Sequence, residues 1–151
     1  MNGSGTQLCT FHLGGLLLGI DVLRVQEVIR SQPMTRVPRA RPEVRGLINL
    51  RGQIVTALDL RRRVGLAPPE HEEEQMNVVV RAGDGAVSLL VDEIGDVLQV
   101  HDDDYEKAPE TLPARLAELV LGIYKLDGAL LLHLDVDGAI EAAPGDAKAA
   151  A

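Results

Sequence analysis

The stretch GLINLRGQIVTALDL, residues 46–60, consists of two apolar runs on either side of Arg51-Gly52. Apolar runs joined by a two-residue turn predict a β-hairpin. Tight hairpin turns favour Asn-Gly or Asp-Gly, because the first turn residue often needs a positive φ. Arginine has no such preference. Either a contact outside the turn selects Arg51, or the exposed tip tolerates it.

The hairpin recurs later in the chain as GIYKLDGALLLHLDV, residues 122–136. The two copies share the turn glycine and the closing aspartate, and they match at apolar positions along both runs. A looser echo links LLLGIDVL, residues 16–23, to VSLLVDEI, residues 87–94. Two matches in the same order indicate that the chain contains two versions of one β unit.

Strand patterns recur along both units and are separated by turn signals such as Gly14-Gly15 and Asp84-Gly85. About five short strands per unit predict a mainly β fold of two small, partly closed barrels, at about 16–66 and 76–136, with terminal segments crossing over. The expected strands lie at 7–13, 16–20, 35–38, 46–51, 53–59, 76–82, 86–91, 95–100, 119–126 and 129–135.

The connections between the strands are predicted from Pro, acidic and capping residues. LAPPEHEEEQ, residues 66–75, reads as an acidic linker loop between the two units. Asp21 is expected to cap a helix over 22–30, and a further helical turn is expected at 115–118. Asp59 and Asp135 each follow an apolar strand and are expected to cap short helices. Residues 142–151 are expected to form a disordered tail.

Composition limits the function classes. The 151 residues are 46% apolar, with one Phe, two Tyr and no Trp. Binders of single-stranded nucleic acid usually stack bases on aromatic side chains, so we expect no nucleic-acid partner. Cys9 is the only cysteine, which excludes an internal disulfide and fits a reducing compartment. The start lacks signal-peptide features, and no apolar run is long enough for membrane insertion, so we expect a cytoplasmic protein.

Charge is distributed unevenly along the chain. Residues 24–63 contain ten arginines and three acids, whereas the remainder contains five cations and twenty acids. This pattern fits a basic face for an acidic protein partner, with an acidic remainder that repels nucleic acid. A solvated surface without a partner is the alternative.

Motifs for catalysis are weak. The four histidines are dispersed without metal-ligand spacing, and Cys9 lies on an alternating strand as a buried apolar residue would. We therefore expect no enzyme activity, no cofactor and no metal. A small nucleic-acid-binding barrel and a small hydrolase remain as rivals, although the first lacks aromatics and the second lacks a paired nucleophile and base.

Several blocks together resemble the CheW coupling proteins of bacterial chemotaxis, over about residues 7–141. They are LGIDVLRVQEVI (18–29), TRVPRARPEVRGLINLRGQIVTALDLRRRVGL (35–66), LLVDEIGDVL (89–98), APE (108–110) and LGIYKLDGALLLHLDVDGAI (121–140). The resemblance implies a single CheW-like domain of two intertwined five-stranded SH3-like barrels. It also implies an adaptor that joins the regulatory domain of the histidine kinase CheA to the cytoplasmic tips of chemoreceptors in membrane-associated arrays. A coupler in a pilus or other chemosensory pathway is the alternative.

The resemblance further implies a receptor-facing groove between the two subdomains. On this interpretation Arg51 is a contact for receptor helices, which would explain a cation at the turn. The implied groove residues are Val25 and Glu27 of RVQEVI, Gly46, Asn49, Arg51 and Gly52 of GLINLRG, and Ile94 and Val97 of DEIGDVL on the other wall.

Overall fold

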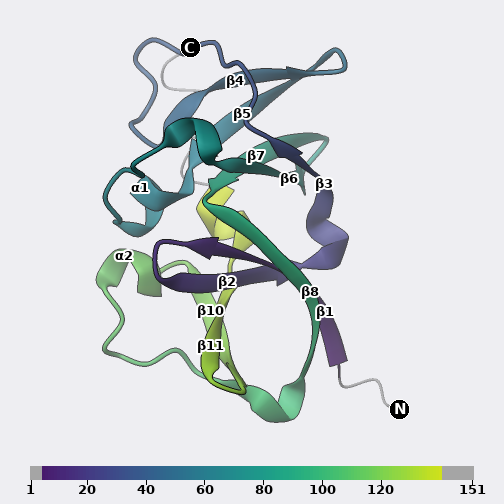
Figure 1. Cartoon of the computed structure of the whole chain (residues 1–151), viewed down its shortest axis with the longest axis vertical. Coiled ribbons are helices and arrows are strands. Elements are labelled where there is room, and N and C mark those ends of the chain that lie inside the picture. Colours follow the sequence, from purple (N-terminus) through teal and green to yellow (C-terminus); the bar gives the residue numbers. More distant parts are fainter. Residues whose placement is uncertain (1–4, 141–151) are drawn as a thin grey trace.

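Two curled β-sheets lie one above the other along the long axis of the molecule (Figure 1). The structure is a computed structural model and describes residues 5–140. Its strands are β1 (Gly5–Leu13), β2 (Leu16–Asp21), β3 (Val25–Arg30), β4 (Val44–Leu50), β5 (Gln53–Asp59), β6 (Met76–Ala82), β7 (Gly85–Val91), β8 (Glu93–His101), β9 (Tyr105–Glu106), β10 (Val120–Leu126) and β11 (Ala129–Leu134).

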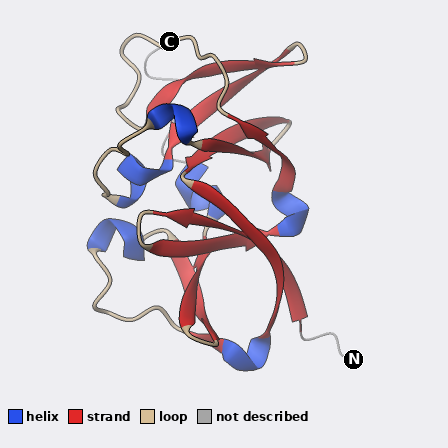
Figure 2. Ribbon diagram, in the orientation of Figure 1, coloured by secondary structure: helices blue, strands red, loops and turns tan. Residues whose placement is uncertain are grey.

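The six-stranded sheet has the order β8-β1-β2-β11-β10-β9, and the five-stranded sheet has the order β3-β6-β7-β5-β4. This SH3-like two-sheet arrangement confirms the predicted mainly β fold class. The sheets are not closed barrels of five strands each. Helices are short (Figure 2), and those between strands are η1 (Val22–Arg24), α1 (Leu60–Val64), η2 (Glu72–Glu74), η3 (Asp102–Asp104) and α2 (Ala114–Ala117). A further helical segment over residues 136–140 follows β11. None of the helices in the described part of the chain has the length and apolar character needed to cross a bilayer.

The repeat in the sequence is also a repeat in the structure. The β4–β5 hairpin occupies the place in its sheet that β10–β11 occupies in the other, and β5 pairs in parallel with β7 as β11 does with β2. The predicted caps are present in both copies. Asp59 Oδ1 accepts from Arg62 N at 3.1 Å, and Asp135 Oδ1 accepts from Gly138 N at 3.0 Å.

The two sheets exchange strands. β3 follows β2 directly but joins the five-stranded sheet, and β8 follows β7 but joins the six-stranded sheet. The chain therefore crosses between sheets at residues 22–24 and at Asp92. The acidic segment 66–75 connects α1 to β6, and β5 and β6 on either side of it belong to the same sheet. The predicted division at 66–75 separates the two sequence repeats but does not separate the two sheets.

Three local predictions need correction. Only Val22–Arg24 of the expected 22–30 helix is helical, capped by Asp21, and Val25–Arg30 forms a strand because it pairs with the apolar β6. The expected strand at 35–38 is reduced to one bridge between Thr35 and Leu47. The β6–β7 turn lies at Gly83-Asp84, one residue earlier than expected, because Gly83 takes the positive φ of 57°.

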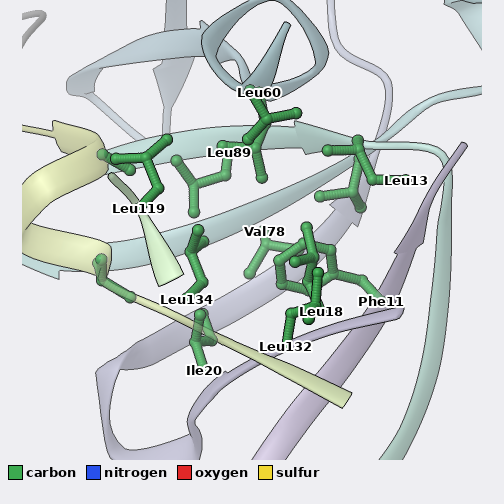
Figure 3. Packing of buried hydrophobic residues seen from close by; sticks show 14 of the residues in the cluster. Phe11, Leu13, Leu18, Ile20, Leu60, Val78, Leu89, Leu119, Leu132 and Leu134 are labelled. Carbon is green, nitrogen blue, oxygen red and sulfur yellow. The ribbon is translucent and has the colours of Figure 1, made fainter. Parts of the chain in front are cut away.

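The hydrophobic core has a central cluster and two smaller ones. The central cluster fills the space between the sheets and includes Phe11, Leu18, Leu89 and Leu134 (Figure 3). A second cluster lies within the five-stranded sheet and a third within the six-stranded sheet. Cys9 belongs to the central cluster, and burial raises the pKa of its thiol, which confirms its predicted apolar role. The predicted tail at 142–151 lies outside the described residues.

Candidate functional site: a protein-contact surface

The β4–β5 turn is built in a conformation that disfavours arginine. Arg51 has φ of 51° and Gly52 has φ of 88°, so both turn residues are left-handed. L-residues other than Asn, Asp and Gly seldom adopt this region, because Cβ approaches the following carbonyl. Gly52 N donates to Asn49 Oδ1 at 2.9 Å, which fixes the turn. The positive φ of Arg51 agrees with the hairpin turn that the sequence predicts.

The side chain of Arg51 forms an ion pair with Glu27. Its guanidinium donates to a carboxylate oxygen of Glu27 on β3. β3 and β4 are the two outer strands of the five-stranded sheet, so this ion pair links the hairpin tip to the opposite edge. The Arg51 side chain remains 70% exposed, against 21% for Glu27. The cation is thus oriented by its partner while most of its surface faces solvent.

The remaining predicted residues have different environments. Asn49 and Gly52 are exposed beside Arg51 on the hairpin. Val25 and Ile94 are partly buried against the central core, each near the start of an exchanged strand. Val97 on β8 is 52% exposed, a high value for valine. The predicted residues therefore comprise exposed positions on the hairpin, two partly buried side chains at the start of exchanged strands, and one exposed valine on β8.

Gly46 is not on the surface. It is buried, and a Cβ at this position would lie 2.8 Å from the Thr35 carbonyl oxygen. The structure therefore assigns Gly46 a packing role beneath the segment that bridges to β4. Its counterpart Gly122 has the same role, since a Cβ there would overlap the ring of Tyr105 on β9. Gly46 can support the candidate contact surface by its packing, but it is not itself exposed for contact.

A charged network that sequence reasoning missed lies at one crossing between the sheets. Arg61 of α1 donates to both carboxylate oxygens of Asp92, from Nε to Oδ1 at 2.9 Å and from Nη2 to Oδ2 at 2.8 Å. Gly14 N in the β1–β2 turn donates to Asp92 Oδ2 at 2.7 Å. Burial raises the pKa of Asp92, but the hydrogen bonds from Arg61 and Gly14 outweigh burial and hold it below its usual value. Only the echo between Asp21 and Asp92 hinted at this network.

A second network fastens the other crossing. Arg24 of η1 pairs with Asp137 at 2.9 Å and donates to the Arg81 carbonyl at 2.8 Å. Arg81 in turn donates to the carbonyl oxygens of Leu23 and Val25. Charge-assisted hydrogen bonds are stronger than neutral ones, so the two networks fix how the sheets meet. Val25 and Ile94 follow these two crossings, at the starts of β3 and β8.

Groups suited to chemistry do not converge in the described part of the chain. Across residues 5–140, no three His, Cys, Asp or Glu side chains lie close enough together to hold a metal ion. Cys9 is buried, and His133 lies against the rings of Tyr105 and Tyr124. The exposed side chains around the oriented Arg51 are therefore a candidate surface for contact with another protein.

Comparison with known proteins gives one consistent family. The family model for the CheW-like domain matches residues 7–143. The chain is 31% identical to the chemotaxis protein CheW of Bacillus subtilis, over 91% of this chain and 88% of that protein. It is 30% identical to CheW of Thermotoga maritima, over 89% and 87%. It is 25% identical to the protein PilI of Pseudomonas aeruginosa, over 76% and 64%. The crystal structure of the scaffolding protein TtCheW from Thermoanaerobacter tengcongensis superposes with a TM-score of 0.77, at 26% identity over 85% of this chain and 88% of that one.

Proposed function

Since the chain belongs to the CheW-like family of chemotaxis adaptors, we propose that it couples chemoreceptor cytoplasmic tips to the regulatory domain of a histidine kinase, CheA. The family as a whole joins receptors and kinase in this way, and the chain's role is that of a scaffold without turnover of its own. Recruitment to membrane-associated receptor arrays follows from receptor binding. The kinase would meet a different surface, at the end of one of the sheets, since the regulatory domain of CheA resembles this fold.

The conformation of Arg51 is the observation that carries the proposal. The left-handed conformation costs less free energy for Asn or Asp than for Arg, and a strained residue of this kind persists where function requires it. Arg51 has φ of 51°, its guanidinium is oriented by Glu27, and its side chain is 70% exposed. Arginine is enriched among residues that dominate binding energy at protein interfaces. We therefore assign Arg51 the central polar contact with the receptor.

The receptor surface combines this cation with apolar side chains. A receptor helix lying along the junction would pack against the apolar residues and hydrogen-bond to Arg51 and Asn49. Glu27 acts by holding the guanidinium in place, and Gly46 acts by letting the 34–35 segment pack closely against the hairpin. The full surface that we propose comprises Val25, Glu27, Asn49, Arg51, Gly52, Ile94 and Val97, with Gly46 beneath it.

Charge reversal at Arg51 tests the proposal. Arg51→Glu removes charge-assisted hydrogen bonds of about 1.5–3 kcal/mol each, so receptor-dependent kinase activation should require at least tenfold more protein. Kinase affinity should stay near the wild-type value. The measurement is receptor-stimulated autophosphorylation of the kinase in reconstituted complexes, alongside kinase affinity and melting temperature.

A charge swap separates binding from folding. The double variant Arg51→Glu/Glu27→Arg restores an ion pair between the hairpin and β3 but leaves an acid at the turn. It should recover any lost melting temperature without recovering receptor coupling. The matched control is Asp127→Arg, which places an arginine at the equivalent tip of the other hairpin and should leave coupling unchanged. Wild-type coupling by Arg51→Glu, or full recovery of coupling by the swap, would show that the receptor binds elsewhere.

A coupler in a pilus pathway is the second candidate. It is supported by the similarity to PilI, which is lower in identity and covers less of both chains than the similarity to the CheW proteins. We therefore prefer chemotaxis. Identification of the histidine kinase that co-purifies with the protein from its own cells distinguishes the two pathways.

A further inference from the structure

A basic cleft of about 1120 Å³ lies on the five-stranded half of the molecule. Its walls are the 31–43 connection, the start of β4 and the neighbourhood of η2 and α1; in Figure 1 the connection arches at the upper left, above η2 and α1. Small-molecule pockets usually measure about 300–1,000 Å³, so this cleft is large for a metabolite. We call it the basic cleft. The residues of the proposed receptor surface do not line it.

The charges around the basic cleft are unbalanced. Five arginines line it against three acids, Asp59, Glu72 and Glu73; the arginines are Arg36, Arg39, Arg41, Arg45 and Arg62. Arg45 is neutralised by Asp59 at 2.9 Å and by Glu72 at 3.5 Å. Within residues 5–140, the side chains of Arg36, Arg39 and Arg62 have no ion-pair partner. The cleft therefore offers guanidinium groups that are available to a ligand.

Apolar side chains form most of the rest of the lining, beside the polar Ser31 and Gln32. Met34, Val37, Val44 and Leu90 line the cleft together with prolines of the 31–43 connection. A free phosphate or other small anion would use the arginines and leave this apolar surface uncovered. A peptide that alternates acidic and apolar side chains would use both. The lining therefore favours a peptide over a small anion.

The chain already places an acidic segment of its own at this cleft. Glu72 and Glu73 of η2 line one side, and Glu72 reaches Arg45 while remaining 62% exposed. Exposed ion pairs of this kind contribute little to stability, typically a fraction of a kcal/mol. Glu72 shows that a carboxylate can reach Arg45, and the exposure of Glu72 means that a stronger acidic ligand can displace it.

We propose that the basic cleft binds an extended acidic peptide segment of a partner protein, in competition with the chain's own Glu72 and Glu73. The arginines at its rim donate paired hydrogen bonds to the peptide's carboxylates, as the fork of a guanidinium allows. The apolar lining residues pack against the peptide side chains between these carboxylates. The site is separate from Arg51, so its occupation is independent of the proposed receptor contact.

Fluorescence anisotropy with a labelled peptide of alternating Glu and Leu tests the proposal. The variant Arg36→Glu/Arg39→Asn removes two available cations, and asparagine tolerates the positive φ of 64° at residue 39. Its affinity should fall at least tenfold. The variant Glu72→Gln/Glu73→Gln removes the competing carboxylates, and its affinity should rise several-fold. The control Arg30→Glu changes an exposed arginine outside the cleft and should change affinity less than twofold.

Each outcome decides the question. Lower peptide affinity in the arginine variant together with higher peptide affinity in the glutamine variant supports the proposal, provided that both variants keep the wild-type melting temperature. If Arg30→Glu lowers peptide affinity as much as the arginine variant does, the attraction is non-specific and the proposal is overturned. Stronger displacement of the peptide by sodium triphosphate, at equal ionic strength, than by unlabelled peptide would assign the cleft to small anions. Stronger binding of a single-stranded oligonucleotide than of the peptide would likewise overturn the proposal. Retained receptor coupling in the arginine variant would separate this site from the one at Arg51.

Discussion

The β4–β5 and β10–β11 hairpins are two copies of one unit that differ at a few informative places. Both contain a buried glycine beneath a crossing segment, a turn glycine and an aspartate cap. In one copy the turn is Arg51-Gly52 with both residues left-handed, and in the other it is Asp127-Gly128 with the positive φ at Gly128. What the copies share builds the fold. Only one copy has the strained and exposed arginine, to which we have proposed to assign the receptor contact.

The caps should show the largest difference in stability. Asp59→Ala removes a helix cap together with the partly buried ion pair to Arg45, and should lower the free energy of unfolding by about 2–3 kcal/mol. Asp135→Ala removes a cap and should cost about 1 kcal/mol. Urea unfolding of both variants measures the difference. Equal costs would mean that the Arg45 pair contributes nothing.

The buried glycines should rank next. Gly46→Ala places a methyl 2.8 Å from the backbone oxygen of Thr35, which cannot move without shifting the bridge to β4. We expect a loss of about 1–2 kcal/mol. Gly122→Ala meets the ring of Tyr105, a 40% exposed side chain that can rotate away, and should cost less than about 1 kcal/mol. Thermal unfolding of the pair tests the ranking, and a larger loss at Gly122 would reverse it.

The two hairpins should also differ in how their stability depends on pH, because of their four strands only β11 contains a histidine. His133 in β11 stands where β5 has Ala57, and burial lowers the pKa of His133 although the neighbouring acids Asp21 and Asp135 oppose the shift. Below its ordinary pKa of about 6.5, the unfolded chain takes up this proton more readily than the folded one, so stability should fall as the pH decreases from about 6.5. His133→Gln should lose less melting temperature than the wild type between pH 7.5 and 5.5. An identical pH profile would show that His133 is not responsible.

The turns should show the smallest effect on stability. Arg51→Asn introduces a residue that tolerates positive φ, and should raise stability by up to about 0.5 kcal/mol after loss of the surface pair with Glu27. Asp127→Asn, at a residue without positive φ, should be neutral. Chemical unfolding compares the two. A stabilised Arg51→Asn that also loses receptor coupling would sharpen the distinction between fold and function, whereas a destabilised one would show that Arg51 serves the turn.

The parts of the fold that sequence predicted are the ones that local pattern determines. The hairpins, their caps and the turn conformation at Arg51 follow from a few adjacent residues. The sequence predicts a helix at Val25–Arg30, where the structure has a strand, because the apolar spacing fits either state and only pairing with β6 decides. The sequence predicts that segments cross over between the two units, but it does not identify β3 and β8 as the strands that cross, since both sheets offer apolar partners.

The candidate site divides in a similar way. Glu27, Asn49, Arg51 and Gly52 were named through family resemblance and lie together around the hairpin. Gly46 was named with them, but its burial under Thr35 depends on a contact across eleven residues that no local pattern reports. The Arg61–Asp92 network joins residues from distant segments, and only the weak echo between Asp21 and Asp92 pointed to it.

The exchange of β3 and β8 has a consequence for any attempt to divide the molecule. A protease nick within 66–75 would yield one fragment carrying β1–β5 and another carrying β6–β11, and each sheet draws strands from both. Neither fragment owns a complete sheet, so neither has a core to fold around by itself. Mixed together, the two are expected to complement one another and regain the native assembly. Each fragment is therefore expected to fold only when the other is bound to it, so that the nicked protein behaves as an obligate heterodimer.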